Sequence, residues 1–274
     1  MSNIALGSFD GLHAAHRAVL RGATAVLLFS EHPQMTLRGQ APPQLLTNEE
    51  RTTRLQAAKL DLLHVDFAEL AMLPPEEFIA LLCGRYGATG LRCGHNFRFG
   101  AGAAGDTTLL RELCRAHSMR LSIVPRIVYR GEIVSSTRIR TALQQGEITQ
   151  ANAMLGRAFG YALPVVHGDH LGRRLGIPTL NQHFPAGFCV PRAGVYASRA
   201  YVDGMWRSAV TNIGCRPSVS HVTVPRSETH IPSFAGNLYG QCVPVRLLQF
   251  LRDERKFATI DDLKAQIERD ITKL

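Results

Sequence analysis

The composition of the sequence and the pattern of its apolar residues change near residue 159, and this change constrains the fold more than any other feature. Residues 1–125 alternate short apolar runs with amphipathic stretches, whereas beyond about residue 159 glycine and proline become dense and short alternating stretches replace helices. Strands that alternate with helices form open parallel sheets with right-handed crossovers. Short strands punctuated by turns indicate a small closed or sandwiched β unit. We therefore expect two abutting domains, residues 1–150 and 151–274.

Apolar periodicity places the individual elements. In the first half we expect strands at residues 4–9, 25–29, 62–67, 90–94 and 121–125, and helices at residues 14–22, 48–59, 74–87 and 108–117. Two consecutive helices, 136–146 and 147–157, precede strands expected at residues 194–204, 206–214, 227–234 and 242–251. Residues 259–274 form an amphipathic helix with Thr259 or Asp261 as its cap.

Composition and charge limit the function classes. Of 274 residues, 45% are hydrophobic and 19% charged, which is typical of a globular chain. Lys and Arg number 31 against 22 acids, a net charge of +9, but the arginines are scattered rather than gathered in a stripe. This pattern favours phosphorylated small molecules over nucleic acid.

The cysteines and the apolar runs indicate the cellular compartment in which the protein is expected. Six cysteines are far apart and form no CxxC pair, so we expect reduced, mostly buried thiols rather than zinc ligands or disulfides. No apolar run approaches the length of a membrane span, and no signal peptide opens the chain. We expect a cytoplasmic protein without a membrane partner, while its oligomeric state stays open.

The stretch "GSFDGLHAAH", residues 7–16, follows the first expected strand, at the edge where parallel sheets collect their ligands. Gly7 and Gly11 allow the backbone to approach a ligand closely. His13 and His16 are three positions apart in the first turn of the next helix, so they share one face. Two imidazoles there can donate hydrogen bonds to a phosphorus centre that gains negative charge. The alternative is two unrelated surface histidines after a turn.

A second candidate anion site is "VSSTRIR", residues 134–140. Ser136 and Arg140 are four positions apart and point the same way on a capped helix. The hydroxyl of Ser136, the unpaired backbone N–H groups of the first helical turn and Arg140 converge there, and together they can bind an anion. A capped surface helix with two arginines is the alternative.

The second half carries a third candidate site, "GDHLGRRLGIPTLN", residues 168–181. Its glycines, Gly168, Gly172 and Gly176, suit a loop that closes over phosphates. In an extended segment Thr179 and Asn181 project to the same side, and their hard oxygens suit Mg²⁺. Taken in isolation, these two are also ordinary turn and loop residues, and Glu228 is a solvated strand charge.

These pieces, in this order, resemble a known family over nearly the whole chain. "GSFDGLHAAH" is similar to the GxFDGxHxGH signature of nucleotidyltransferases that make FAD, and "CGHNFRFG" and "VSSTRIR" to two further segments of that family. "GDHLGRRLGIPTLN", "TNIGCRPS", "ETHIPSFAGNLYG" and "LRDERKFATIDDLKAQIERD" resemble the riboflavin kinase module that commonly follows. The chain resembles the bacterial bifunctional riboflavin kinases and FAD synthetases (FMN adenylyltransferases).

The resemblance implies a fold, two reactions and their site residues. The fold is α/β, a Rossmann-like domain with a parallel sheet followed by a small antiparallel β-barrel and a C-terminal helix. The substrates and products are riboflavin, FMN, FAD and ATP, with Mg²⁺ at the kinase site. His13, His16 and Glu228 have catalytic roles, Glu228 as the base, and Thr179 and Asn181 hold the metal. The residues implied to bind nucleotide or phosphate are Gly7, Phe9, Asp10, Gly11, Asn96, Ser136, Thr137, Arg140, Gly168, Gly172, Arg173 and Gly176.

The departures from the family pattern fall mostly in the first domain. Ala15 replaces the second glycine of HxGH, Ser30 stands where an acid or amide is usual, and the helix after His16 is short. They leave one alternative open, a riboflavin kinase with a degenerate nucleotide-binding first domain. A basic nucleic-acid-binding or regulatory module is the alternative from another class.

Overall fold

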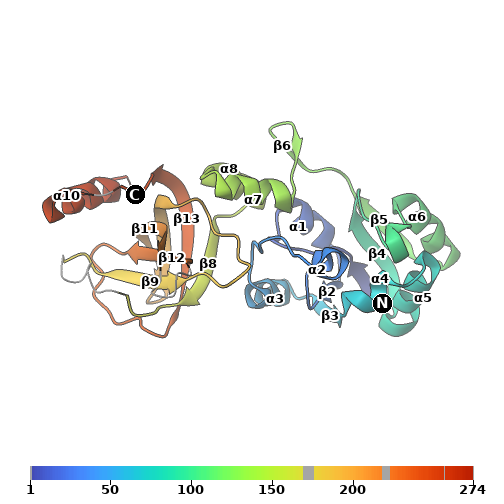
Figure 1. Cartoon of the computed structure of the whole chain (residues 1–274). Coiled ribbons are helices and arrows are strands. Elements are labelled where there is room, and N and C mark those ends of the chain that lie inside the picture. Colours follow the sequence, from blue (N-terminus) through green and yellow to red (C-terminus); the bar gives the residue numbers. More distant parts are fainter. Residues whose placement is uncertain (1, 169–175, 218–222, 256, 274) are drawn as a thin grey trace. The chain divides into compact units, whose positions relative to one another are not determined.

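The structure is a computed structural model that describes residues 2–168, 176–217, 223–255 and 257–273. Gly172 and Arg173, both expected to bind phosphate, lie outside the described residues. The chain divides into two compact units, Met1–Ser136 and Thr137–Leu274 (Figure 1).

A five-stranded parallel sheet forms the centre of the first unit, with strand order β3-β2-β1-β4-β5. Its strands are β1 (Ser2–Ala5), β2 (Ala25–Phe29), β3 (Asp61–Val65), β4 (Ala88–Gly94) and β5 (Arg120–Val124). The order reverses between β1 and β4, so the crevice at their carboxyl ends is the expected ligand position of such a sheet. β1 ends at Ala5, earlier than the strand expected over residues 4–9, because the chain turns sharply after Leu6.

Helices cover both faces of this sheet (Figure 1). They are α1 (Ala14–Leu20), α2 (Pro33–Arg38), α3 (Asn48–Ala57), α4 (Phe67–Ala71), α5 (Pro75–Tyr86) and α6 (Thr107–Ala116), with a 3-10 turn at Ala101–Ala103. Successive strand residues point to opposite faces. Ile4 and Leu27 pack against α5 and α6, whereas Ala5 and Val26 pack against α1 and α3. The unit also has a small hairpin of β6 (Val128–Tyr129) and β7 (Glu132–Ile133).

The second unit is built on a curled six-stranded antiparallel sheet, with strand order β8-β13-β10-β11-β12-β9. Its strands are β8 (Phe159–Pro164), β9 (Thr179–His183), β10 (Gly194–Val202), β11 (Met205–Pro217), β12 (Thr223–His230) and β13 (Cys242–Arg252). A bridge between Val166 and Asn181 joins the two ends of the sheet and curls it toward a barrel. The expected fold class is confirmed in both units.

The interior of this sheet is mostly apolar, and a chain of hydroxyls crosses it. The ring of Tyr196 and the side chain of Val245 are fully buried. The hydroxyls of Ser198, Thr211 and Thr229 form hydrogen bonds of 2.8 and 2.9 Å in sequence across β10, β11 and β12. These buried residues alternate with outward-facing ones, so the polar side chains next to Thr229 lie on the outer face of β12.

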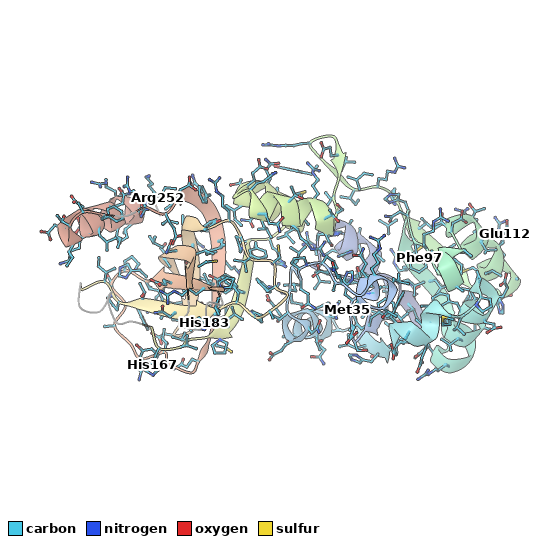
Figure 2. The ribbon with its side chains drawn as sticks, viewed as in Figure 1. Met35, Phe97, Glu112, His167, His183 and Arg252 are labelled. Atoms are coloured by element: carbon cyan, nitrogen blue, oxygen red, sulfur yellow. The ribbon has the colours of Figure 1, made fainter. Side chains whose placement is uncertain are left out.

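Among its described residues, the second unit carries the helices α7 (Ser136–Gln144), α8 (Ile148–Leu155) and α10 (Ile260–Ile271), and the first residue of α7, Ser136, falls in the first unit. Asn152 ties α8 to the sheet, because its amide donates to the carbonyl of Leu247 at 2.9 Å and accepts from the N–H of Phe159 at 2.6 Å. Thr259, rather than Asp261, caps α10 by accepting from the N–H of Asp262. Arg252, labelled in Figure 2, lies at the end of β13 and anchors α10 through an ion pair with Asp270.

Candidate active sites

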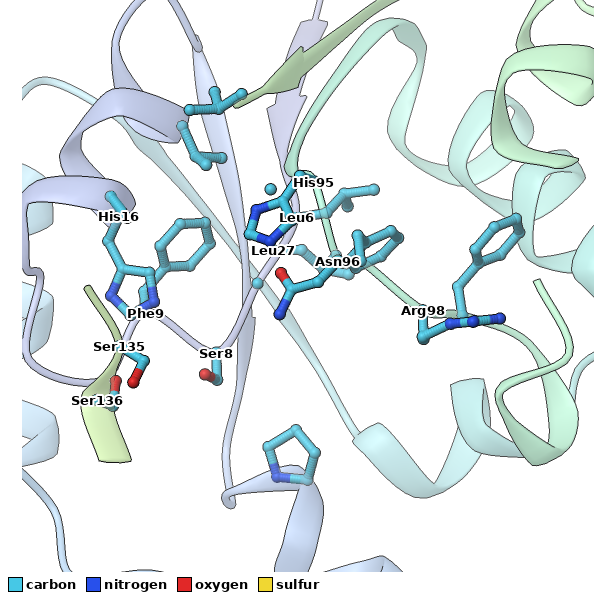
Figure 3. A pocket seen from close by; sticks show the side chains of 18 of the residues that line it. Leu6, Ser8, Phe9, His16, Leu27, His95, Asn96, Arg98, Ser135 and Ser136 are labelled. Carbon is cyan, nitrogen blue, oxygen red and sulfur yellow. The ribbon is translucent and has the colours of Figure 1, made fainter. Parts of the chain in front are cut away.

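A cavity of about 730 Å³ opens in the first unit at the carboxyl ends of β1 and β4. The segment Leu6–Phe9 lines it from β1 and Gly94–Gly100 from β4, with Ser135 and Ser136 at another wall. Figure 3 shows His16, His95, Asn96 and Ser136 around this space. The cavity therefore occupies the switch point that the strand order predicts.

His13 and His16 meet at this cavity, and both line it. Their rings are stacked with centroids 3.6 Å apart, and the ring of Phe9 meets His16 edge-on at 5.4 Å. His13 is the N-cap of α1, and its Nδ1 accepts a hydrogen bond from the N–H of His16 at 3.3 Å. Since Nδ1 is the acceptor, the proton of the neutral His13 ring lies on Nε2. The expected pairing of the two imidazoles is thus present in the structure.

The loop that carries these histidines has an unusual backbone. Phe9 and Leu12 have φ angles of 52° and 45°, in the left-handed region that side chains rarely adopt. Asp10 is buried, and its carboxylate accepts from the N–H of Leu45 at 2.8 Å. An alanine at Gly11 (φ 85°) would place its Cβ 2.8 Å from the side chain of Leu45. Asp10 and Gly11 therefore fix the shape of the loop through their contacts with Leu45, and neither of them lines the cavity.

Ser136 and Asn96 come from distant parts of the sequence to the same cavity. The hydroxyl of Ser136 donates to the carbonyl of Asp10 at 2.9 Å, which fixes this residue against the histidine loop. Gly7, Phe9 and Asn96 line the cavity as expected. Thr137 and the buried Arg140 belong to the second unit, so their assignment to the same phosphates stays a prediction.

Sequence reasoning missed several side chains near this cavity. Ser8, His95 and Arg98 line it directly. Arg51 of α3 donates to the carbonyls of Ser8 and Phe29 at 3.2 and 3.3 Å, and so joins the ends of β1 and β2. Burial lowers the pKa of Arg51, and the nearby carboxylate of Asp10 opposes this shift. No spacing marked Arg51, whereas His95 and Arg98 lie inside the quoted "CGHNFRFG" segment.

In the second unit, the candidate kinase residues meet through strand register. Glu228 of β12 lies opposite Asn181 of β9 on one side and opposite Asn212 of β11 on the other. Thr179 is two residues from Asn181, on the same side of β9, and pairs with His230. All of these are on the outer face, since their neighbours Gln182 and Thr229 are fully buried. The structure therefore brings together Thr179, Asn181 and Glu228.

Charged and amide side chains flank Glu228 on the outer face of the sheet. Arg226 forms an ion pair with Glu228 at 2.7 Å. The amide of Asn212 donates to Glu254 at 2.9 Å. The sequence contained a signal for Arg226, because residues two apart on a strand share a face. It contained none for Asn212, whose place depends on the pairing of β11 with β12.

The glycine-containing segment that precedes β9 is only partly described. Gly168 packs against Asn181 so closely that an added Cβ would lie 2.6 Å from the amide of Asn181. Gly176 has φ 74° and is exposed. Thr179 also lines a second cavity of about 360 Å³, together with Pro178, Thr229, Phe234 and Tyr239. His167, labelled in Figure 2, stacks on the ring of Tyr239 at 3.9 Å.

Comparison with known proteins places both halves of the chain in one family. A family model described as FAD synthetase matches residues 1–138, and one described as riboflavin kinase matches residues 155–274. The bifunctional riboflavin kinase/FMN adenylyltransferase of Escherichia coli (strain K12) is 34% identical, over 97% of this chain and 90% of that protein. The chain belongs to the bifunctional riboflavin kinase/FMN adenylyltransferase family. The resemblance inferred from its motifs is confirmed.

Other relatives of this family match at similar length. The bifunctional riboflavin kinase/FMN adenylyltransferase of Bacillus subtilis (strain 168) is 32% identical, over 98% of this chain and 90% of that protein. A crystal structure described as a macrolide-efflux protein from Streptococcus pneumoniae is 28% identical, with a TM-score of 0.88 over 98% of this chain and 92% of that one. Within the described parts of this chain, none of the helices combines the length and apolar character that crossing a membrane requires.

Proposed function

We propose that this chain phosphorylates riboflavin to FMN with ATP, and adenylylates FMN to FAD with a second ATP. One observation carries the kinase half, namely the position of Glu228 directly opposite Asn181 in the domain matched to riboflavin kinase. The stacked His13 and His16 at the switch-point cavity support the adenylyltransferase half.

In the phosphorylation step, Glu228 acts as the general base. Its carboxylate takes the proton of the ribityl 5′-hydroxyl while that oxygen forms a bond to the γ-phosphorus and ADP leaves. A carboxylate on a rigid strand, rather than on a loop, suits this role because the base must remain within hydrogen-bond reach of the hydroxyl.

Thr179 and Asn181 would hold Mg²⁺ for this step. The donor set fits the ion, because a hydroxyl and an amide oxygen are hard ligands and Mg²⁺ keeps much of its coordination for phosphate and water. In the described part of the chain, no group of three or more His, Cys, Asp or Glu side chains is placed to hold a metal. When bound, the ion neutralises charge on the phosphates.

In the adenylylation step, the protein supplies position and charge rather than a nucleophile. A phosphate oxygen of FMN attacks the α-phosphorus of ATP and pyrophosphate leaves. The Nε2–H of His13 donates to the oxygens that gain charge, and the stacked His16 shares this task. Asn96 and Ser136 are proposed to hold flavin or phosphate groups in that cavity, and Thr137 and Arg140 are proposed to bind phosphate.

The two reactions are proposed to divide between residues 1–150 and 151–274. The FAD synthetase match, which ends at residue 138, and the riboflavin kinase match, which begins at residue 155, support this division. We also propose that the enzyme works in the cytoplasm, because its six cysteines are far apart in the sequence and form no CxxC pair, a pattern that favours reduced thiols.

A product assay on three proteins tests the proposal. Wild type, His16→Ala and Glu228→Gln are each incubated with riboflavin, ATP and Mg²⁺, and FMN is separated from FAD. Removing the base is expected to slow FMN formation by about 10²- to 10⁴-fold, while FAD formation from added FMN stays intact. His16→Ala is expected to lose FAD formation alone.

Matched controls are His117→Ala and Glu268→Gln, which change exposed residues of the same two types. Both should keep both activities. If the wild type made FMN but no FAD, the first domain would be a degenerate nucleotide-binding module. Intact FMN formation by Glu228→Gln would overturn the assignment of the base. Salt-dependent binding of nucleic acid without any flavin turnover would overturn the proposal as a whole.

A further inference from the structure

Arg51 of α3 is a half-buried arginine to which the proposed mechanism assigns no role. Its Nη1 donates to the carbonyl of Ser8 at 3.2 Å, and its Nη2 donates to the carbonyl of Phe29 at 3.3 Å. Ser8 and Phe29 both line the cavity of the first unit, whereas Arg51 lies behind them and does not line it. Burial disfavours the charge of a guanidinium, so a cation kept in this position needs a physical reason.

The residues before and after Phe9 are both held by the segment that carries Arg51. The N–H of Leu45 donates to the carboxylate of Asp10 at 2.8 Å, on one side of Phe9, and Arg51 holds the carbonyl of Ser8 on the other side. Between these two contacts Phe9 has a φ angle of 52° and a fully buried side chain. A residue with a side chain keeps such a backbone conformation only where the surrounding contacts enforce it.

Phe9 in turn contacts the histidine pair. Its ring meets the ring of His16 edge-on, with centroids 5.4 Å apart, and His16 stacks on His13 at 3.6 Å. Figure 3 shows Phe9 next to His16 at the cavity. A change in the backbone at Ser8 would therefore reach both imidazoles through the ring of Phe9.

We propose that Arg51 is a positioning residue for FMN adenylylation. It holds the carbonyl of Ser8 and so keeps Phe9 in the conformation that contacts His16. This inference rests on the proposed role of the two histidines. In that reaction an FMN phosphate oxygen bonds to the α-phosphorus of ATP, the bond from this phosphorus to the α,β-bridging oxygen breaks, and pyrophosphate leaves. The imidazoles must lie in place as charge develops, and displacements of about 1 Å can lower such rates about 100-fold.

An arginine suits this position better than a lysine. Its planar guanidinium presents several donors in fixed directions, whereas a lysine ammonium is a point charge on a flexible stem. Here the two terminal nitrogens of Arg51 reach carbonyls at the ends of two different strands, and Nη2 also donates to the side-chain oxygen of Asn48 at 3.1 Å. We therefore expect Arg51→Lys to keep the charge but to lose the bridge between Ser8 and Phe29.

The kinetic test compares Arg51→Met and Arg51→Lys with wild type in the full-length enzyme. It measures kcat of FMN adenylylation, KM for ATP and FMN, riboflavin phosphorylation in the same preparations, and a urea unfolding curve. Arg51→Met is expected to lower kcat of adenylylation about 10- to 100-fold, with changes in either KM below about threefold, because the displaced imidazoles act in the transition state. Arg51→Lys should recover part of kcat, and riboflavin phosphorylation should be unchanged in both variants.

A spectroscopic test follows the imidazoles directly. The NMR signals of the Cε1–H groups of His13 and His16 depend on the stacking of the rings, because each aromatic ring shifts the signals of its neighbours. They are assigned from their loss in His13→Gln and His16→Gln. We expect both signals to move in Arg51→Met without any substrate present.

The matched control is Arg54→Met, which changes an arginine of the same helix that pairs with Glu50 at 2.6 Å. It should leave kcat of adenylylation and both histidine signals unchanged. A normal kcat in Arg51→Met would overturn the inference whatever its urea midpoint, because Arg51 would then only stabilise the fold. If Arg51→Met does not fold, Arg51→Lys decides, and a normal kcat with unmoved histidine signals would overturn the inference. A wild type that makes no FAD would instead overturn the proposed adenylyltransferase function itself, together with this role.

Discussion

Asn181 of β9 and Glu228 of β12 are directly opposed in the antiparallel ladder of the second unit. Side chains in this relation have Cβ atoms about 4.5–5.5 Å apart. The register of two strands thus sets the distance between a candidate magnesium ligand and a candidate base. A one-residue slip of β9 would turn Asn181 into the interior and bring Leu180 or Gln182 to the site.

Gly168→Ala is predicted to impair this site by crowding. The new Cβ would lie 2.6 Å from the amide of Asn181, so the amide must shift from its present position. Overpacking of this kind costs about 1–3 kcal/mol. We expect riboflavin phosphorylation to need a higher Mg²⁺ concentration for half-maximal rate, measured by titrating MgCl₂ at fixed ATP. Gly84→Ala, whose Cβ meets nothing within 4 Å, is the control. An unchanged Mg²⁺ requirement in Gly168→Ala would contradict the prediction.

Local sequence signals predicted the first unit well. The strand expected over residues 25–29 is β2, Ala25–Phe29. The helix expected over residues 74–87 is α5, Pro75–Tyr86, which begins with a proline in its first turn and ends at the left-handed Gly87. Short elements were missed. α2 has only six residues and is capped by His32 rather than by a common capping residue, so neither periodicity nor a cap marked it.

Some residues of the candidate sites could likewise be predicted from local spacing, and others could not because they come from distant parts of the chain. His13 and His16 were predicted to meet because a helical spacing of three residues is local. Ser136 reaches the carbonyl of Asp10 from 126 positions away, which no local spacing shows. Asn212 joins Glu228 only through the β11–β12 register. Motif resemblance supplied Ser136, whereas Asn212 and Arg51 needed the structure.

The thiols should react in an order set by burial and pKa. Burial raises the pKa of Cys93 from 9.0 to about 12 and that of Cys114 to about 11. Because the thiolate is the nucleophile, these two remain protonated and inert from pH 8 to 10. Cys215 and Cys242 are exposed. We expect iodoacetamide to label the exposed pair first in the native protein, as measured by mass spectrometry of digested samples.

A denatured sample is the control for this order, since all six thiols should then be labelled. The Cys215→Ser/Cys242→Ser double variant should lose the fast labelling in the native state. Early labelling of Cys93 or Cys114 in the native protein would show that the β4–α6 core opens more readily than its packing indicates.

Asp270→Asn is predicted to destabilise the second unit. Asp270 is fully buried, and its carboxylate accepts from Arg252 at 2.8 Å and from the amide of Gln266 at 2.8 Å. The asparagine keeps the shape but leaves the mostly buried guanidinium of Arg252 without its counter-charge. Removing one partner of such a pair costs about 3–5 kcal/mol of the free energy of unfolding. Urea titration followed by circular dichroism measures this loss. Asp261→Asn, at an exposed position in the first turn of α10, should cost less than about 1 kcal/mol. Equal stability of the two variants would mean that α10 does not depend on the Arg252–Asp270 pair.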